Sequence, residues 1–145
     1  MSKNLSGMIS VYTLTAFLFM LSSCSHPDSV VNESTATRKS IGRWRLSGIK
    51  SGWTNIMSTP AKKVVLVIDE QRQAIVFEDG KETVRFQYIL TEANPGILRY
   101  SIHQQSGAST LFYPPTHGNF RVSSKQLIIG DTGVNGNDYF FAKQY

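Results

Sequence analysis

Apolar and polar side chains alternate along most of the chain from residue 41 onward, and this pattern predicts short β-strands. The stretch from Thr83 to Tyr88 alternates strictly, which places Val84, Phe86 and Tyr88 on one face. Alternation or a short β-branched run predicts strands at residues 42–49, 63–68, 73–77, 83–88, 98–102, 109–113, 120–123, 126–129 and 138–143. Helical spacing is not sustained anywhere beyond the N-terminal apolar run, so no helix is expected there.

Turn signals separate the predicted strands. Asp79-Gly80 favours a two-residue type I′ hairpin because both central residues need a positive φ, and Asn94-Pro95-Gly96 breaks the chain. About nine short strands at near-regular spacing favour an antiparallel up-and-down meander, closed into a barrel or folded as a sandwich. Closure removes exposed strand edges, and a barrel of about eight strands is either filled by side chains or holds one small ligand. We therefore expect an all-β fold of about 8–9 short strands that forms a small β-barrel.

The N-terminal segment has a different pattern. Residues 8–21 read MISVYTLTAFLFML and contain only three polar side chains. A span across a bilayer core of about 30 Å needs roughly 20 residues, so this length is typical of the apolar core of a signal peptide. Lys3 precedes the run, and the small pair Ser22-Ser23 stands directly before Cys24. The segment therefore resembles the bacterial lipoprotein signal, which ends in small residues and an obligatory cysteine.

This resemblance implies cleavage before Cys24 and attachment of diacylglycerol to its sulfur. The alternative is an ordinary signal peptide or a buried N-terminal strand, in which the cysteine is incidental. Lipid chains hold a protein on a bilayer because each buried methylene contributes about 0.8 kcal/mol. Residues 24–40 are polar apart from Val30 and Val31, so we expect the lipidated cysteine to be followed by a flexible tether. Ser25 stands where Asp would favour inner-membrane retention, so the expected location is the outer membrane of the cell envelope.

Charge argues against a nucleic-acid partner. The chain carries 15 Lys and Arg against 10 Asp and Glu, a net charge of +5, and only Lys3 is lost with residues 1–23. Within the domain no basic cluster is longer than Lys62-Lys63, whereas proteins that bind phosphate backbones concentrate their cations. The acidic pairs Asp69-Glu70 and Glu78-Asp79 fall in predicted turns, where we expect carboxylates to stay solvated.

No catalytic, metal or cofactor site is expected. Cys24 is the only cysteine, so it has no partner for a disulfide or a shared metal. Asp131-Thr132-Gly133 spells the aspartic-protease triplet, but that chemistry needs a second copy facing the first. The loop from Asp131 to Gly136 partly resembles a calcium loop, yet its glycines and asparagines fit a turn better. His103 and His117 have no ligand neighbours at metal-binding spacing, so we expect a protein that is not an enzyme.

Two short motifs stand at the ends of the domain, residues 41–145. Gly42-Arg43-Trp44 opens the first strand, and the last strand, Asn137 to Lys143, ends in an aromatic residue, a spacer and a basic residue. The first motif matches the G-x-W signature of lipocalin barrels, and the whole domain resembles the short lipocalin-like domains common in Bacteroidetes lipoproteins. The resemblance implies that Lys143 packs across Trp44 near the closed end of the barrel, a cation–π contact of about 0.5–2 kcal/mol.

Two functions fit such a membrane-anchored domain. The first is binding of a small hydrophobic ligand inside the barrel, in a pocket lined by inward aromatic side chains. The candidates for this lining are Phe77, Phe86, Tyr88, Tyr100 and Tyr113. The alternative is an envelope interaction or inhibitor module with a filled, ligand-free barrel, whose partner is another protein. For that module the expected docking sites are the loops at residues 51–60 and 113–119, with Trp53 and Tyr113-Pro114-Pro115, because function tends to lie on loops.

Overall fold

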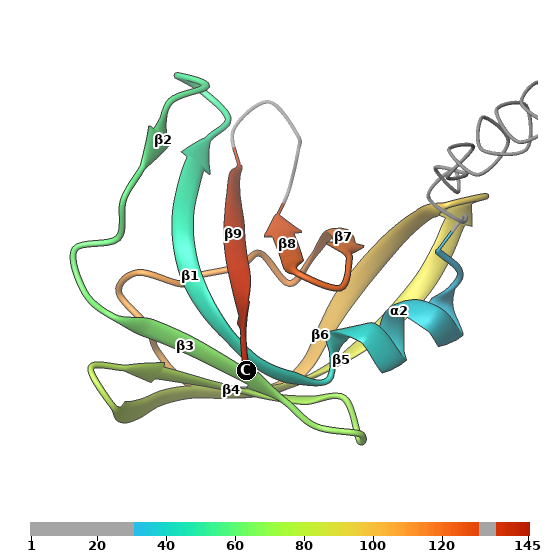
Figure 1. The fold of residues 1–145 in the computed structure, drawn as a ribbon, viewed down its shortest axis with the longest axis horizontal. Coiled ribbons are helices and arrows are strands. Elements are labelled where there is room, and N and C mark those ends of the chain that lie inside the picture. Colours follow the sequence, from blue (N-terminus) through green and yellow to red (C-terminus); the bar gives the residue numbers. More distant parts are fainter. Residues whose placement is uncertain (1–30, 131–135) are drawn as a thin grey trace, which may run out of the picture.

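The structure is a computed structural model that describes residues 31–130 and 136–145. These residues form one α-helix and nine β-strands (Figure 1), which confirms the all-β fold predicted from the alternation. The elements are α2 (Glu33–Ser40), β1 (Gly42–Ser51), β2 (Met57–Ser58), β3 (Val64–Ile68), β4 (Gln73–Glu78), β5 (Lys81–Asn94), β6 (Ile97–Gly107), β7 (His117–Val122), β8 (Gln126–Gly130) and β9 (Asn137–Gln144).

The strands form one antiparallel sheet that closes on itself. The strands are neighbours in the order β2-β1-β3-β4-β5-β6-β7-β8-β9, so β3 follows β1 around the ring, and β2, at the end of this order, pairs with β1. Pairing of β1 with β9, from Arg43 opposite Gln144 to Ser51 opposite Asn137, completes the ring. The short strand β2 pairs with the last part of β1, at Ile49 and Lys50, while β3 pairs with the first part. The predicted up-and-down barrel is therefore confirmed, with eight strands in the ring and β2 as an addition.

The two ends of the barrel carry different structures (Figure 1). At the helix end lie α2, the β3–β4 turn, the β5–β6 turn and the last residues of β9. At the loop end lie the β1–β2 loop, the β4–β5 turn and residues 108–116, which connect β6 to β7. The β1–β2 hairpin projects beyond the ring at this end.

Alternation along the strands decides what fills the barrel. The cross-strand row of Trp44, Leu66, Val76 and Val84 points inward, and all four side chains are buried. Residues one position away point to the outer face, since successive side chains of a strand alternate. The interior is thus a single apolar core enclosed by the ring.

The β4–β5 turn forms as its dipeptide predicts. Glu78 lies opposite Lys81, so Asp79 and Gly80 are the two loop residues of the hairpin. Both have a positive φ, 49° for Asp79 and 86° for Gly80, as a type I′ turn requires.

One predicted strand is wrong, and two are much longer than predicted. Residues 109–113 form a loop, because the Ser109 hydroxyl accepts hydrogen bonds from the backbone N–H groups of Leu111 (3.2 Å) and Phe112 (2.8 Å). This side-chain bonding replaces the ladder bonds of a strand. Strand β5 continues to Asn94 and β6 begins at Ile97, so the two residues Pro95 and Gly96 join them.

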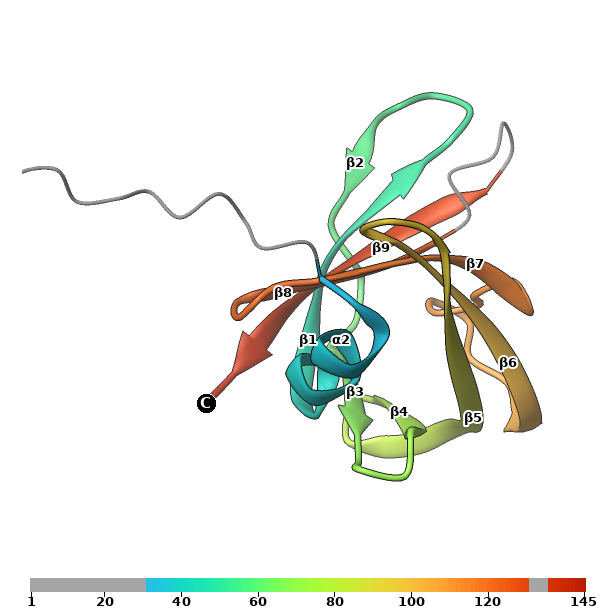
Figure 2. The same cartoon turned by 90° about the vertical axis from the view of Figure 1, so that its right-hand side faces the viewer.

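The prediction of a flexible tether over residues 24–40 is wrong for its second half, which forms α2. The Asn32 side chain caps this helix by accepting the Thr35 N–H at 2.9 Å, with Glu33 in the first turn and basic residues in the last. Ala36 and Ser40, one helical turn apart, are fully buried against the barrel. Figure 2 looks onto the helix end and shows α2 across the end of the ring, where it contacts β5 and β7. The folded domain therefore begins before residue 41.

Candidate functional site

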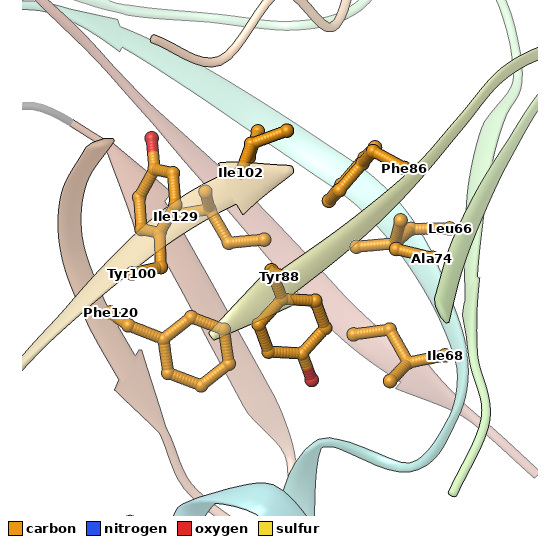
Figure 3. A pocket seen from close by; sticks show the side chains of 9 residues that line it. All are labelled: Leu66, Ile68, Ala74, Phe86, Tyr88, Tyr100, Ile102, Phe120 and Ile129. Carbon is orange, nitrogen blue, oxygen red and sulfur yellow. The ribbon is translucent and has the colours of Figure 1, made fainter. Parts of the chain in front are cut away.

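Three of the five predicted ligand-binding residues meet inside the barrel (Figure 3). Phe86, Tyr88 and Tyr100 line one small cavity, and the Tyr88 ring stacks on that of Phe120 with ring centres 5.8 Å apart. The remaining lining residues are Leu66, Ile68, Ala74, Ile102 and Ile129. The cavity has a volume of about 10 Å³, which is no more than a single water molecule needs.

The other two predicted ligand-binding residues are wrong. On β4 the side chains of Ala74 and Val76 are buried in the core, so Phe77 points to the outer face, opposite Val65 of β3. Tyr113 is 68% exposed, because residues 109–113 do not form the strand that would have turned its ring inward. Only its backbone reaches the core: the Tyr113 N–H donates to the Tyr139 hydroxyl at 3.3 Å, and that hydroxyl donates to the Tyr113 carbonyl at 3.1 Å.

Phe112, which the alternation pattern did not select, fills the loop end of the barrel. Its side chain is 1% exposed and meets Tyr139 and Phe141 edge to face, with ring centres 4.9 Å and 5.3 Å apart. A third ring, that of Phe86, lies 6.3 Å away. Edge-to-face pairs of this kind add about 0.5–1.5 kcal/mol each beyond area burial. The plug loop, residues 108–116, therefore inserts an aromatic side chain into the loop end of the barrel.

A buried carboxylate holds the plug loop in place. Glu78 is 8% exposed, so the expectation of a solvated carboxylate is wrong for this residue. It accepts hydrogen bonds from the Ser109 hydroxyl, from the Thr110 N–H at 3.1 Å and hydroxyl at 3.2 Å, and from the Leu111 N–H at 3.4 Å. Burial alone would raise the pKa of Glu78, but the bonds from Ser109, Leu111 and Thr110 together hold this pKa below its ordinary value. The carboxylate is thus a fixed anchor for three consecutive loop residues.

The barrel signature residues meet at the helix end. Lys143 places its Nζ atom 4.9 Å from the centre of the Trp44 ring, which confirms the predicted contact, and also donates to the Lys39 carbonyl at 3.3 Å. The Trp44 Nε1–H donates to the Ser40 carbonyl at 2.7 Å. Both acceptors are carbonyls at the end of α2 that lack a partner within the helix. Gly42 has a φ of +127°, a backbone conformation that favours glycine, and its absent Cβ would lie in ordinary contact with the Lys143 Cε atom at 3.4 Å.

Tyr88 links this end to the cavity. Its hydroxyl lies 3.0 Å from the Ser40 hydroxyl in the buried interior. Burial raises the pKa of the Tyr88 phenol, and the bond to Ser40 opposes that rise only in part. The phenol is therefore a neutral hydrogen-bonding group that ties α2 to the core.

A second, wider hollow lies outside the barrel, between α2, the β3–β4 turn and β5. It has a volume of about 510 Å³ and is lined by Asn32, Glu33, Ser34, Thr37, Arg38, Ile41, Arg72 and Glu92. Glu33 and Arg72 form an ion pair across it at 3.3 Å. A polar surface of this kind does not suit the apolar ligand expected for the barrel.

Several large apolar side chains are exposed at the loop end. Trp53 is 75% exposed, Ile56 66% and Met57 51%, and all three belong to the β1–β2 loop or β2. Backbone hydrogen bonds order this loop, including Gly52 N–H to the Gly136 carbonyl at 2.8 Å. These three apolar residues and Tyr113 lie in the two segments predicted as docking loops, residues 51–60 and 113–119. Trp53 and Trp44 thus have opposite environments, since Trp44 is completely buried.

The other residues singled out from the sequence do not come together in one site within the described part of the chain. No three His, Cys, Asp or Glu side chains there gather closely enough to hold a metal ion. His103 and His117 each lie 3.3 Å from a neighbouring hydroxyl, of Ser101 and Thr116. Cys24 and residues 131–135 lie outside the described part of the chain.

Within the part of the chain that the structure describes, no helix has the length and apolar character needed to cross a membrane. Comparisons with protein-family models, with curated proteins and with solved structures found no match to this chain.

Proposed function

We propose that this protein is a lipid-anchored module of the outer membrane that binds a protein partner through the loop end of a filled barrel. The observation that carries the proposal is the cavity volume of about 10 Å³. Pockets for small organic ligands measure roughly 300–1,000 Å³. A barrel filled by its own side chains acts as a rigid support, so its function falls to the surface and the loops.

The exposed apolar residues support a docking role for the loop end. Trp53, Ile56, Met57 and Tyr113 are each more than half exposed, and burying such side chains against a partner is favourable. Tyrosine and tryptophan are also the residues most enriched at the energetic centres of protein interfaces.

The proposed anchor is diacylglycerol on Cys24, supported by the resemblance of residues 1–24 to a bacterial lipoprotein signal. Mass spectrometry of protein extracted from its own membranes should find acyl chains on this cysteine and no residues 1–23. Cys24→Ala should block processing and acylation. The anchor is refuted when the Cys24→Ala protein is still cut at the same place and stays with the membranes as the wild type does.

The docking role is tested by chemical crosslinking of the full-length protein in its own membranes. The variant Trp53→Ala with Tyr113→Ala should lose at least about tenfold of the crosslinked product, since a few aromatic side chains carry most of the binding energy in many interfaces. The control is Ile89→Ala with Ile97→Ala, which removes exposed apolar side chains from β5 and β6. Equal losses in both variants would contradict the proposal.

A second candidate is the small-ligand carrier, and one observation favours it. Phe112 enters the barrel on a loop, so its withdrawal would leave a space lined by aromatic rings that a small apolar molecule could fill. A fluorescent fatty-acid probe titrated into the wild-type protein distinguishes the candidates. Saturable binding at tens of micromolar or below, displaced by native lipid extract, would favour the carrier. The filled barrel predicts no binding.

A further inference from the structure

We propose that the partner of the loop end carries an acidic surface, which the outer wall of β1 and β3 recognises by its uncompensated cations. This inference rests on the proposed docking function and specifies the chemistry of the partner. It is carried by an apolar tip on the β1–β2 hairpin and by a basic wall on the outer face of β1 and the start of β3.

The apolar tip consists of Trp53, Ile56 and Met57. Met57 lies opposite Lys50 in the β1–β2 pair, and its side chain occupies the position where a Cβ of Gly48 would be. The missing side chain at Gly48 therefore allows Met57 to pack over β1. The tip is continuous with the outer surface of the barrel and is not a separate, detached loop.

The basic wall consists of Arg43, Arg45, Lys62 and Lys63, which are all exposed. Arg43 and Arg45 lie opposite Val67 and Val65 of β3, so these two arginines and two valines share the outer face. The next strand continues these rows with Ile75 and Phe77, both partly buried. Arginine, methionine and aromatic side chains are enriched in protein interfaces, and the tip and the wall together present all three.

The charges of this wall have no counterpart within its own strands. Residues 41–68 contain five basic residues, the four of the wall and Lys50, and no acidic residue. None of the ion pairs among the described residues involves these five side chains.

Among the carboxylates around the wall, Glu82 and Asp138 are paired with cations outside it, whereas Asp79 bonds to the backbone of the wall's own Lys63. Glu82 is paired with Arg85 at 3.0 Å, and Asp138 lies 3.8 Å from Arg121. Asp79 accepts the backbone N–H of Lys63 at 3.1 Å. The wall therefore presents excess positive charge, which speeds association with a negatively charged partner and repels a second copy of this chain.

The shape of the combined surface favours a protein over a lipid bilayer. The tip projects beyond the ring at the loop end, whereas Arg43 lies near the helix end, opposite Gln144 (Figure 1). A flat bilayer that takes up the projecting tip would leave the wall in water. A protein can follow both the wall and the tip, so we assign the occupant as an acidic protein.

The test uses the full-length protein in its own membranes with the photo-crosslinker p-benzoylphenylalanine at position 53. A matched control carries the crosslinker at position 97, because Ile97 is 50% exposed on β6. Each crosslinker protein is combined with the wall variant, Arg45→Glu with Lys63→Glu. A control variant, Arg99→Glu with Lys125→Glu, changes the net charge by the same amount at positions outside the wall. Thermal melting of each variant verifies that it is folded.

The expected result is a crosslinked protein from position 53 and none from position 97. Its yield should fall at least about tenfold with Arg45→Glu and Lys63→Glu, and on raising the salt from about 0.05 M to about 0.5 M. The Arg99→Glu and Lys125→Glu control should change it less than about twofold, and the captured protein should be acidic.

The other outcomes each decide a different point. A protein crosslink from position 53 that survives both charge reversal and salt overturns the acidic partner and leaves the docking function standing. Crosslinks only to lipid or only to a second copy overturn the inference in favour of those occupants. No crosslink from position 53 refutes the proposed docking function itself.

Discussion

Lys143 is the last basic residue of β9, and its ammonium group has two partners at once. It lies over the Trp44 ring and donates to the Lys39 carbonyl at the end of α2. A cation at this point also complements the partial negative charge of a helix C-terminus. The same side chain therefore closes the ring and fixes the helix.

We predict that Lys143→Met lowers the free energy of unfolding by about 1–2 kcal/mol, since it removes the cation–π contact and leaves a helix carbonyl without its donor. Lys143→Arg should retain most of that stability, because a guanidinium supplies both interactions. Urea unfolding of the three proteins measures the effect. Equal stability of the methionine and arginine variants would contradict this role.

Glu78 has the corresponding role at the other end. Glu78→Gln should destabilise the protein at pH 7 by about 1–3 kcal/mol, because the buried amide cannot accept all four of the bonds that the carboxylate accepts. Urea unfolding measures this loss. Glu82→Gln, at an exposed ion pair, serves as the control and should stay within about 0.5 kcal/mol of the wild type.

The pKa of Glu78 also predicts a pH dependence. Because its folded pKa lies below the ordinary 4.5, the contribution of the carboxylate is fully present above that pH and is lost as the pH falls through the folded value. Melting temperatures of the wild type should therefore fall more steeply than those of Glu78→Gln below pH 4.5. Parallel curves for the two proteins would show that the plug loop does not depend on this charge.

Single residues differ in how well the sequence reveals them. Trp44 and Lys143 were predicted because they form a recurring pair at fixed positions in the strand order. Glu78 was expected in water because it precedes Asp79-Gly80, yet the last inward position of β4 turns its side chain toward the plug loop. Which segment would fold back over that position depends on contacts across 31 residues of chain, between Glu78 and Ser109, and no local pattern contains that information.

Among the elements, α2 shows most clearly how a weak local signal is settled by tertiary contact. Its sequence ESTATRKS is polar, and only Ala36 and Ser40 are buried, so no apolar stripe announces a helix. The barrel stabilises it through Trp44, Lys143 and Tyr88, which bond to its last turn. The strands of the ring needed no such help to be located, although the alternation at residues 83–88 marked only the middle of β5, which runs from Lys81 to Asn94.

We predict that Ala36→Asp detaches α2, since it would place a charge in a fully buried position against the barrel. Trypsin should then cut after Arg38 and Lys39 several times faster than in the wild type. Ser34→Asp is the matched control, because Ser34 is exposed in the first turn, where a carboxylate is favourable. The docking of α2 is refuted if both variants are cut at the wild-type rate.

At the scale of the whole molecule, the filled interior decides whether the barrel can hold a ligand or only supports its surface loops. The alternation correctly brought Phe86, Tyr88 and Tyr100 together, but it could not show whether space remained between them. That depends on the plug loop, whose Phe112 was assigned to a strand that does not form. A loop that packs through one side chain leaves no periodic signal, so the sequence left both readings of the barrel open.

Phe112→Ala should lower the free energy of unfolding by about 3–5 kcal/mol, the usual cost of removing a buried phenylalanine ring. Where the variant stays folded, it should bind a small apolar fluorescent probe that the wild type does not bind. Phe112→Leu, with a loss of about 1–2 kcal/mol, keeps the measurement possible if the alanine variant unfolds. Tyr113→Ala, at the exposed neighbouring residue, should change stability by less than about 0.5 kcal/mol.

The two tryptophans give the molecule a pair of built-in optical reporters. Trp44, fully enclosed beside the helix, should emit at short wavelength and escape a soluble quencher such as iodide. Trp53, exposed on the hairpin at the opposite end, should emit further to the red and be quenched freely. Phenylalanine in place of either one would leave a single emitter, so that unfolding of the ring and occupation of the hairpin could be followed separately, without any added dye.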